Sequence, residues 1–167
     1  VIRHLYPIAS CRMYGTDYNF AAVKWCRQSF PFGYFVVNHL EPPLPFAAES
    51  FDLIYALSVF THLPNSLQIP WMEEMFRVLQ RGGYLIITVH GASYMGIMEP
   101  EEKELFLRRG FVVRYEEYAG TNLCAAFHSF EYIQKELAYM FELVDFIPEG
   151  AKGNPHQDLY LLRKPVV

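Results

Sequence analysis

Buried-type strands alternate with helices over the first half of the chain. The apolar runs Phe51–Leu57 and Tyr84–Val89 are nearly continuous, which is typical of strands covered on both faces. Between them, apolar residues recur at helical spacing over Ile69–Leu79, and we expect Gly82 and Gly83 to end that helix. Shorter elements complete the alternation: strands at Cys11–Thr16 and Tyr34–Val37, and a helix at Ala21–Cys26. This order predicts an α/β fold with a doubly wound, mostly parallel sheet.

The alternation of buried strands and helices changes after Gly91. Three further elements are expected: helices at Glu99–Arg109 and Phe130–Met140, and a strand at Phe111–Tyr118. Ser129 is the candidate cap of the second of these helices. The last two strands, Phe141–Ile147 and Leu159–Leu162, are separated by turn-forming residues and not by a helix. They therefore predict an antiparallel strand pair at the C-terminal end of the sheet, and we expect a single domain over residues 1–167.

Composition and charge narrow the classes of function. The 167 residues carry 14 Lys+Arg against 18 Asp+Glu, a net charge of −4, which argues against a nucleic-acid partner held by phosphate contacts. No apolar run approaches the roughly 18 residues of a membrane span, and no signal peptide is visible. The three cysteines form no CxxC pair and are expected to be reduced thiols of a cytoplasmic protein. The histidines form no HxxxH pair, so we expect no metal site.

An acidic residue follows the first expected strand. In nucleotide-binding α/β sheets, ligands lie at the carboxyl ends of the strands, and an acid that ends the second strand accepts hydrogen bonds from the ribose hydroxyls. Asp17 suits this role and suits equally the capping of the helix that follows. The same fingerprint places a glycine-rich loop about 20 residues earlier, which falls before residue 1. We therefore expect an N-terminally truncated domain without that loop and without the first strand of the sheet.

Several segments taken together resemble the class I S-adenosylmethionine-dependent methyltransferases of type 11/12. They are Gly15–Asn19, Leu44–Phe46, Glu49–Ile54, Phe60–Leu63 and Glu74–Leu85. Each segment is a weak signal, and their order and spacing make the ensemble specific. The resemblance covers residues 1–95, and the final hairpin agrees with it. It implies a Rossmann-like fold, with S-adenosylmethionine as the cofactor.

The resemblance also implies positions for the adenosine part of the cofactor. Asp17 would hold the ribose hydroxyls, with Tyr18 and Asn19 flanking the adenosine. Asn38 follows the next strand, where the family often has an acid that contacts the adenine amino group, and its carboxamide oxygen can accept the same hydrogen bond. The backbone of Leu40 is a rival for that contact, and Asn38 is otherwise an ordinary turn residue.

Other positions would surround the methionine part of the cofactor and the acceptor. Ala56, Leu57 and Ser58 end the fourth strand of the family's sheet and would shape the methionine pocket. His62 and His90 are the catalytic candidates, since a neutral imidazole can take a proton from a substrate hydroxyl. For His62 we favour a packing role over a catalytic one.

The acceptor is expected to be chosen by residues 94–130, a substrate-side insertion. Tyr94 and His128 are its candidate substrate residues, although a loop tyrosine and a histidine beside a helix cap are common without function.

The resemblance implies methyl transfer to a small-molecule or sugar acceptor by in-line attack on the sulfonium methyl group. Such a transfer needs alignment and exclusion of water more than acid–base catalysis. Two other functions stay open: a methyltransferase-like module that binds a partner without catalysis, and an NAD-dependent oxidoreductase. A missing strand would expose a sheet edge, which also leaves a homo-oligomer open.

Overall fold

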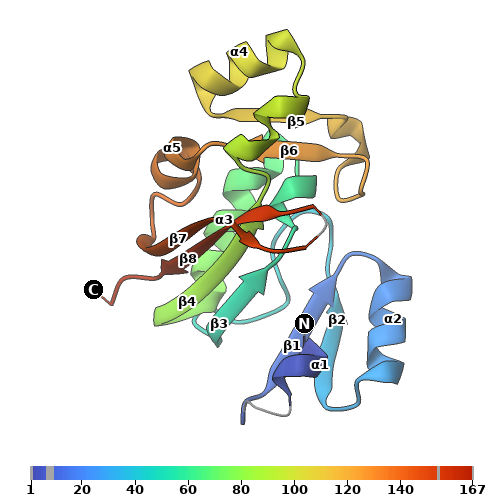
Figure 1. Cartoon of the computed structure of the whole chain (residues 1–167). Helices are drawn as coiled ribbons and strands as arrows, with labels where there is room; N and C mark the ends of the chain where they lie inside the picture. The colour runs from blue at the N-terminus through green and yellow to red at the C-terminus, as the bar shows by residue number, and fades with distance from the viewer. Residues whose placement is uncertain (1, 7–9, 154, 167) are drawn as a thin grey trace. The chain divides into compact units, whose positions relative to one another are not determined.

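The computed structural model of the protein describes residues 2–6, 10–153 and 155–166 (Figure 1). Contacts divide the chain into two compact units, one up to Pro45 and one from Phe46 onward. The strands of the two units belong to separate sheets.

The first unit is a parallel strand pair with a crossover helix. It contains α1 (Ile2–Leu5), β1 (Met13–Asp17), α2 (Phe20–Ser29) and β2 (Gly33–Val37). β1 and β2 pair in parallel along their whole length, up to Asp17 opposite Val37. The ring of Phe35 covers Gly15 and Gly33, where a Cβ atom would meet that ring at 2.8 Å. Small residues are therefore required on this face of the pair.

The second unit contains a four-stranded sheet in the order β3 (Phe51–Ala56), β4 (Leu79–Val89), β8 (Gln157–Arg163) and β7 (Glu142–Ala151). β3 and β4 are parallel, whereas β8 is antiparallel to both β4 and β7. The predicted α/β fold is confirmed. Helices connect its parallel strands, and its last two strands form the expected antiparallel pair.

The helix α3 (Asn65–Val78) packs on this sheet through Trp71, Met72, Met75 and Val78, which are buried. It begins four residues before the predicted start, and the prediction that Gly82 and Gly83 end it is wrong. Those glycines lie inside β4, at an irregularity where the pairing with β3 shifts register. Gly82 has a φ of +75°, and a Cβ atom at Gly83 would meet a carbonyl oxygen at 2.9 Å. Glycine is needed here by the bulged strand and not by the helix end.

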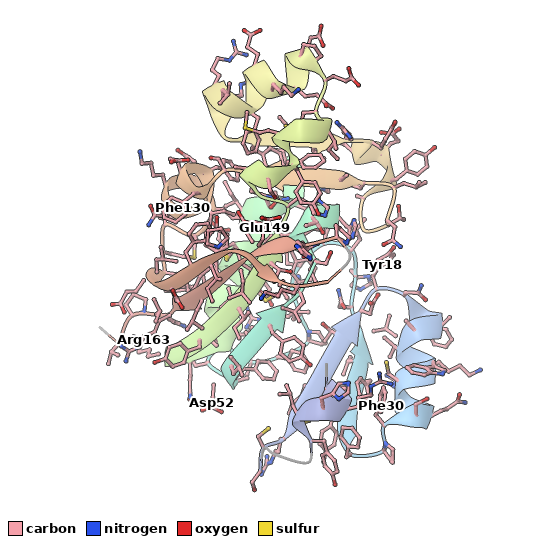
Figure 2. All side chains as sticks on the ribbon, in the orientation of Figure 1. Tyr18, Phe30, Asp52, Phe130, Glu149 and Arg163 are labelled. Carbon is pink, nitrogen blue, oxygen red and sulfur yellow. The ribbon has the colours of Figure 1, made fainter. Side chains whose placement is uncertain are left out.

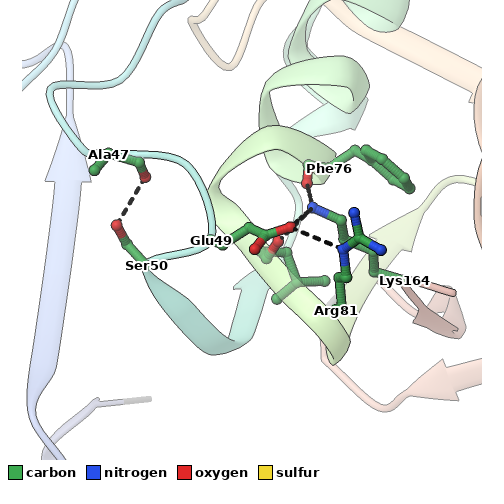
Figure 3. Close-up of polar contacts among 7 residues, drawn as sticks. Ala47, Glu49, Ser50, Phe76, Arg81 and Lys164 are labelled. Atoms are coloured by element: carbon green, nitrogen blue, oxygen red, sulfur yellow. Dashed lines mark hydrogen bonds and ion pairs between the residues drawn. The ribbon is translucent and has the colours of Figure 1, made fainter. Parts of the chain in front are cut away.

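A buried lysine fixes the end of α3 to the C-terminal residues (Figure 3). Lys164 is 7% exposed, and its ammonium group donates to the carbonyl oxygens of Phe76 and Leu79, each at 2.8 Å. Glu49 lies 3.6 Å from the same ammonium and 3.4 Å from the guanidinium of Arg81. The lysine thus satisfies carbonyls that the end of a helix leaves without donors.

The remaining elements form a smaller layer around α4 (Pro100–Arg109), β5 (Phe111–Arg114) and β6 (Ala125–His128). Met98, Phe106, Val112 and Phe127 make its core. β5 is shorter than predicted, because Tyr115 adopts a φ of +56° and begins the short helix η3 (Glu116–Tyr118). β6 was not predicted at all: alanine and histidine are weak strand formers, and antiparallel pairing with β5 decides its conformation.

The single helix predicted over Phe130–Met140 is wrong in form. The structure has a short α5 (Phe130–Tyr132) followed by a π-helical turn, η4 (Ile133–Leu137). The cap prediction is confirmed, since the hydroxyl of Ser129 accepts a hydrogen bond from the Tyr132 amide at 3.1 Å. Within the described ranges, no helix is long and apolar enough to cross a membrane.

Candidate functional site

In the first unit, the ends of β1 and β2 bring two predicted residues together. The backbone amide of Asn38 donates to the backbone carbonyl of Asp17 at 3.2 Å. One carboxylate oxygen of Asp17 accepts from the amide of Asn19 at 2.8 Å, and the side chain of Asp17 is exposed. The side chain of Asn19 caps α2 by accepting from the amides of Ala21 and Ala22. The cap of α2 is therefore Asn19 and not Asp17, whose carboxylate orders the loop before the helix, and the ribose contact of Asp17 stays a prediction.

The side-chain oxygen of Asn38 is buried without a donor among the residues that the structure describes. The side-chain nitrogen of Asn38 donates to the carbonyl oxygen of His39 at 2.6 Å, so the side-chain oxygen of Asn38 can accept a hydrogen bond. Tyr18 is 41% exposed beside Asp17 (Figure 2), and Leu40 is half-buried two residues after Asn38. The five residues predicted to contact the adenosine thus lie at the carboxyl ends of one parallel strand pair.

In the second unit, Ser58 follows β3 in a strained conformation held by buried polar groups. Its φ is +59°, and its amide donates to the hydroxyl of Thr88 at 2.8 Å. The side chain of Gln157 donates to the Ser58 hydroxyl at 2.8 Å and accepts from Thr88 at 2.6 Å. The Thr61 hydroxyl lies 3.0 Å from that of Ser58. A left-handed serine persists only where its surroundings impose it, and this network does so.

The two residues before Ser58 differ in exposure. Ala56 is buried, whereas Leu57 is 38% exposed and presents an apolar surface at the carboxyl end of β3.

His62 connects two segments of the second unit. It ends the short helix η1 (Phe60–His62), and its Nδ1 lies 2.8 Å from the carbonyl oxygen of Cys124. A carbonyl oxygen only accepts, so Nδ1 carries the proton. The backbone carbonyl of His62 also accepts from the amide of Gly120 at 2.7 Å. His62 therefore ties η1 to the segment before β6.

His90 lies directly after β4 in an aromatic cluster. Its ring is 4.4 Å from the Tyr94 ring and 5.5 Å from the Phe127 ring, measured between centroids. Burial and, to a smaller extent, the charge of His62 lower the pKa of His90 to about 4, against the opposing effect of a hydrogen bond to the Ala126 backbone. His90 is therefore neutral at pH 7, and its Nδ1 is buried without a partner among the described residues.

Tyr94 belongs to the short helix η2 (Ala92–Ile97). Its hydroxyl donates to the carbonyl oxygen of His156 at 2.8 Å. Burial raises the pKa of Tyr94, and the carboxylates of Glu149 and Asp158 raise it further. The tyrosine thus packs on the His90 ring and lies within electrostatic reach of two carboxylates.

His128 lies in the core. Its side chain has no exposed surface, and its Nε2 is 3.1 Å from the side-chain oxygen of Gln68. The Gln68 amide nitrogen donates to two backbone carbonyls, so its oxygen accepts, and the proton of His128 lies on Nε2. Burial and, to a smaller extent, the charge of His90 lower the pKa of His128 to about 3. In this position a substrate has no surface of His128 to contact, because the ring faces Gln68 in the core.

Four residues at this edge were not foreseen from the sequence: Thr61, Thr88, Gln157 and Asp158. Part of the signal for Gln157 and Asp158 was the predicted antiparallel hairpin. Its last strand, β8, runs antiparallel to β4, so the start of β8 lies beside the end of β4. Asp158 is indeed paired with Val89.

The comparisons with known proteins agree with this architecture. Residues 1–87, more than half of the chain, match the family model described as "Methyltransferase domain". The chain belongs to this methyltransferase family. S-adenosylmethionine is accordingly the cofactor of the methyltransferase, as the resemblance implied. A search of curated proteins found no significant match.

Solved structures share the fold of the methyltransferase at low sequence identity. A S-adenosylmethionine-dependent methyltransferase from Mesorhizobium loti has a TM-score of 0.74 at 14% identity, over 98% of this chain and 85% of its own. A SAM-dependent methyltransferase from Methanosarcina mazei has a TM-score of 0.65 at 18% identity, over 92% and 82%.

A third structure is the 1,6-didemethyltoxoflavin-N1-methyltransferase of Burkholderia thailandensis with bound 1,6-didemethyltoxoflavin and S-adenosylhomocysteine. It has a TM-score of 0.66 at 12% identity, over 98% of this chain and 65% of its own. At these identities the likeness concerns the fold.

Proposed function

We propose that the methyltransferase acts on a small-molecule acceptor, with sugars included in that class. The observation that carries this proposal is an open cavity of about 660 Å³ in the second unit, which borders η2, α4, α5 and β7. Cavities of roughly 300–1,000 Å³ are typical of small-molecule sites. The net charge of −4 supports the same choice, because it disfavours a nucleic-acid acceptor. The chain covers 65% of the toxoflavin methyltransferase, whose substrate is also a small molecule.

The adenosine contacts are assigned to the first unit. Two acceptors lie at the ends of its strands: the exposed carboxylate of Asp17, and the carboxamide oxygen of Asn38, which has no donor among the described residues. Two vicinal ribose hydroxyls and an adenine amino group are donors that suit them. Tyr18 supplies an exposed ring beside Asp17, and the backbone of Leu40 stays the alternative adenine contact. Asn19 shapes this turn as the cap of α2.

The contacts to the methionine part are assigned to the second unit. Ser58 holds a fixed backbone conformation at the end of β3, with the buried Ala56 and the exposed Leu57 before it. A pre-organised polar turn beside an apolar side chain orients a ligand at little entropic cost.

The bound cofactor supplies an already activated methyl group, so the residues of the chain have mainly to orient the acceptor and exclude water. His90 is neutral at pH 7 and offers a lone pair to an acceptor hydroxyl. With a pKa of about 4 it is a weak base, so its role is to orient that hydroxyl more than to remove the proton. Tyr94 packs on His90 and restricts the ring, and the charge of His62 lowers the pKa of His90.

Residues 94–130 are proposed to be the substrate-side segment. They supply Met95 and the end of α4, from Phe106 to Gly110, to the wall of the cavity. The cytoplasm is the proposed location, supported by three cysteines that form no disulfide among the described residues.

The proposal is tested by the distribution of label from methyl-labelled S-adenosylmethionine in a cell extract treated with the full-length protein. Label in the filtered low-molecular-weight fraction is the expected result. Label confined to protein or nucleic acid would overturn the small-molecule assignment.

The cofactor assignment is tested separately by calorimetric titration of S-adenosylhomocysteine. Asp17→Ala should weaken binding at least about tenfold, because it removes a charge-assisted contact. Asp145→Ala, an exposed carboxylate in β7, is the matched control and should leave the affinity unchanged.

A further inference from the structure

One wall of the cavity in the second unit is apolar. Aromatic and aliphatic side chains from four elements line it: Met95, Phe106, Phe130, Tyr132, Phe146 and Pro148. Figure 2 shows Phe130 and Glu149, which belong to two of the elements that border it. Its charged residues Arg108, Arg109, Glu131, Lys135, Glu136 and Glu149 are all exposed. Exposed charges of both signs are screened by solvent, so the rim carries no dominant charge.

One charged residue of the lining is different, because it is buried. Asp158 is 6% exposed, and one of its carboxylate oxygens accepts from the amide of Glu149 at 2.9 Å. The other oxygen faces Gly91 so closely that a Cβ atom there would lie 1.8 Å away. Within the described part of the chain, no lysine, arginine or histidine lies within ion-pair distance of this carboxylate.

An ionised carboxylate that is buried without a counter-charge destabilises the protein, so such a group either takes up a proton or is paired with a cation. Tyr94 does not supply it, since its hydroxyl donates to a backbone carbonyl. Burial raises the pKa of Asp158, the hydrogen bond from the Glu149 amide opposes this, and the charge of Glu149 raises the pKa further, so the ionised form has a neutral donor but no counter-charge among the described residues. A cation beside Asp158 would provide that compensation.

We propose that this cavity binds the cationic amine of the acceptor, with the ammonium group at Asp158 and the apolar body along the aromatic wall. The inference rests on the proposed function for the statement that the bound amine is the acceptor. An ammonium nitrogen has no free lone pair, so this contact recognises the acceptor, and a different atom receives the methyl group. Aromatic walls suit such a ligand, because ring faces attract cations as well as apolar groups.

The test compares two probes of the same shape, phenethylamine and phenethyl alcohol, by calorimetric titration of the full-length protein. The amine should bind at least about tenfold more tightly than the alcohol, the magnitude of one charge-assisted contact. Asp158→Asn should abolish this preference while keeping the acceptor for the Glu149 amide. Glu131→Gln changes an exposed carboxylate of the same rim and should keep the preference.

Equal binding of the two probes, or an amine preference that survives in Asp158→Asn, would overturn the proposal. If the asparagine variant does not fold, nuclear Overhauser contacts between the bound amine and the rings of Phe130 and Phe146 in the unsubstituted protein decide instead. Their absence at saturating amine would refute the site. Binding needs no turnover, so amine binding without methyl transfer to small molecules would refute the proposed function alone.

Discussion

The buried His128 should make the stability of the protein depend steeply on pH. Burial lowers its pKa from 6.5 to about 3. Between these pH values the ring is therefore neutral in the folded protein and protonated in the unfolded chain. The stability contributed by the neutral ring is therefore complete above pH 6.5 and is lost as the pH falls toward 3. The loss is about 1.4 kcal/mol per pH unit, or about 2 kcal/mol between pH 6.5 and about pH 5.

His90 adds to this dependence, since its pKa is lowered from 6.5 to about 4. Together the two rings should cost about 4 kcal/mol over the same interval, a large part of the roughly 5–15 kcal/mol that stabilises a typical domain. His128→Gln isolates one contribution, because glutamine does not titrate and still has an N–H group to donate to Gln68. Its oxygen replaces the His128 Nδ1, which has no partner among the described residues either.

The assay is urea unfolding of the unsubstituted protein and of His128→Gln at pH 7, 6 and 5. The variant should start less stable at pH 7 through imperfect packing, and it should then lose about 2 kcal/mol less than the unsubstituted protein on acidification to pH 5. Parallel losses in the two proteins would refute the reasoning, because they would show that His128 already accepts a proton in the folded state.

Two further substitutions test packing contacts by urea unfolding at pH 7. Lys164→Met should destabilise the protein by about 2–3 kcal/mol, because two carbonyls at the end of α3 lose their buried donor, whereas Arg81→Gln, in an exposed pair, should change stability by less than about 1 kcal/mol. Equal effects would contradict the role given to the buried ammonium. Gly91→Ala should cost about 1–3 kcal/mol by displacing the Asp158 carboxylate. Gly96→Ala serves as its control, because a Cβ atom there would meet no described residue other than its chain neighbours within 4 Å. A neutral Gly91→Ala would show that this carboxylate moves freely.

Much of the fold was predictable because its central strands carry strong local signals. The apolar runs of β3 and β4 and the hairpin of β7 and β8 were found from sequence pattern alone. The segment over β6 was missed because its conformation depends on pairing with β5, a tertiary contact that no local pattern contains. Gly82 and Gly83 were misread for the same reason, since a glycine pair looks alike at a helix end and in a bulged strand.

The candidate site was predictable to the extent that strand ends indicate it. Asp17 and Asn38 are neighbours because each directly follows or ends a strand of one parallel pair. The burial of a side chain is a different kind of property. His90 and His128 look equivalent in sequence, yet of the two only His128 has its ring fully enclosed, because successive residues at the end of β6 are buried on both faces and the ring lies beside Gln68.

The antiparallel direction of β8 explains why two polar features lie at one edge of the sheet in the second unit, the network around Ser58 and the carboxylate of Asp158. β8 runs antiparallel to β4, so its first residues lie beside the end of β4, where a parallel strand would place its last ones. Successive side chains of a strand point to opposite faces, so Gln157 and Asp158 serve different sides of the sheet. Gln157 holds the network that fixes Ser58, and Asp158 turns toward the apolar cavity. Because the two roles use opposite faces, a substitution of Asp158 changes the cavity without removing a hydrogen bond from the turn after β3.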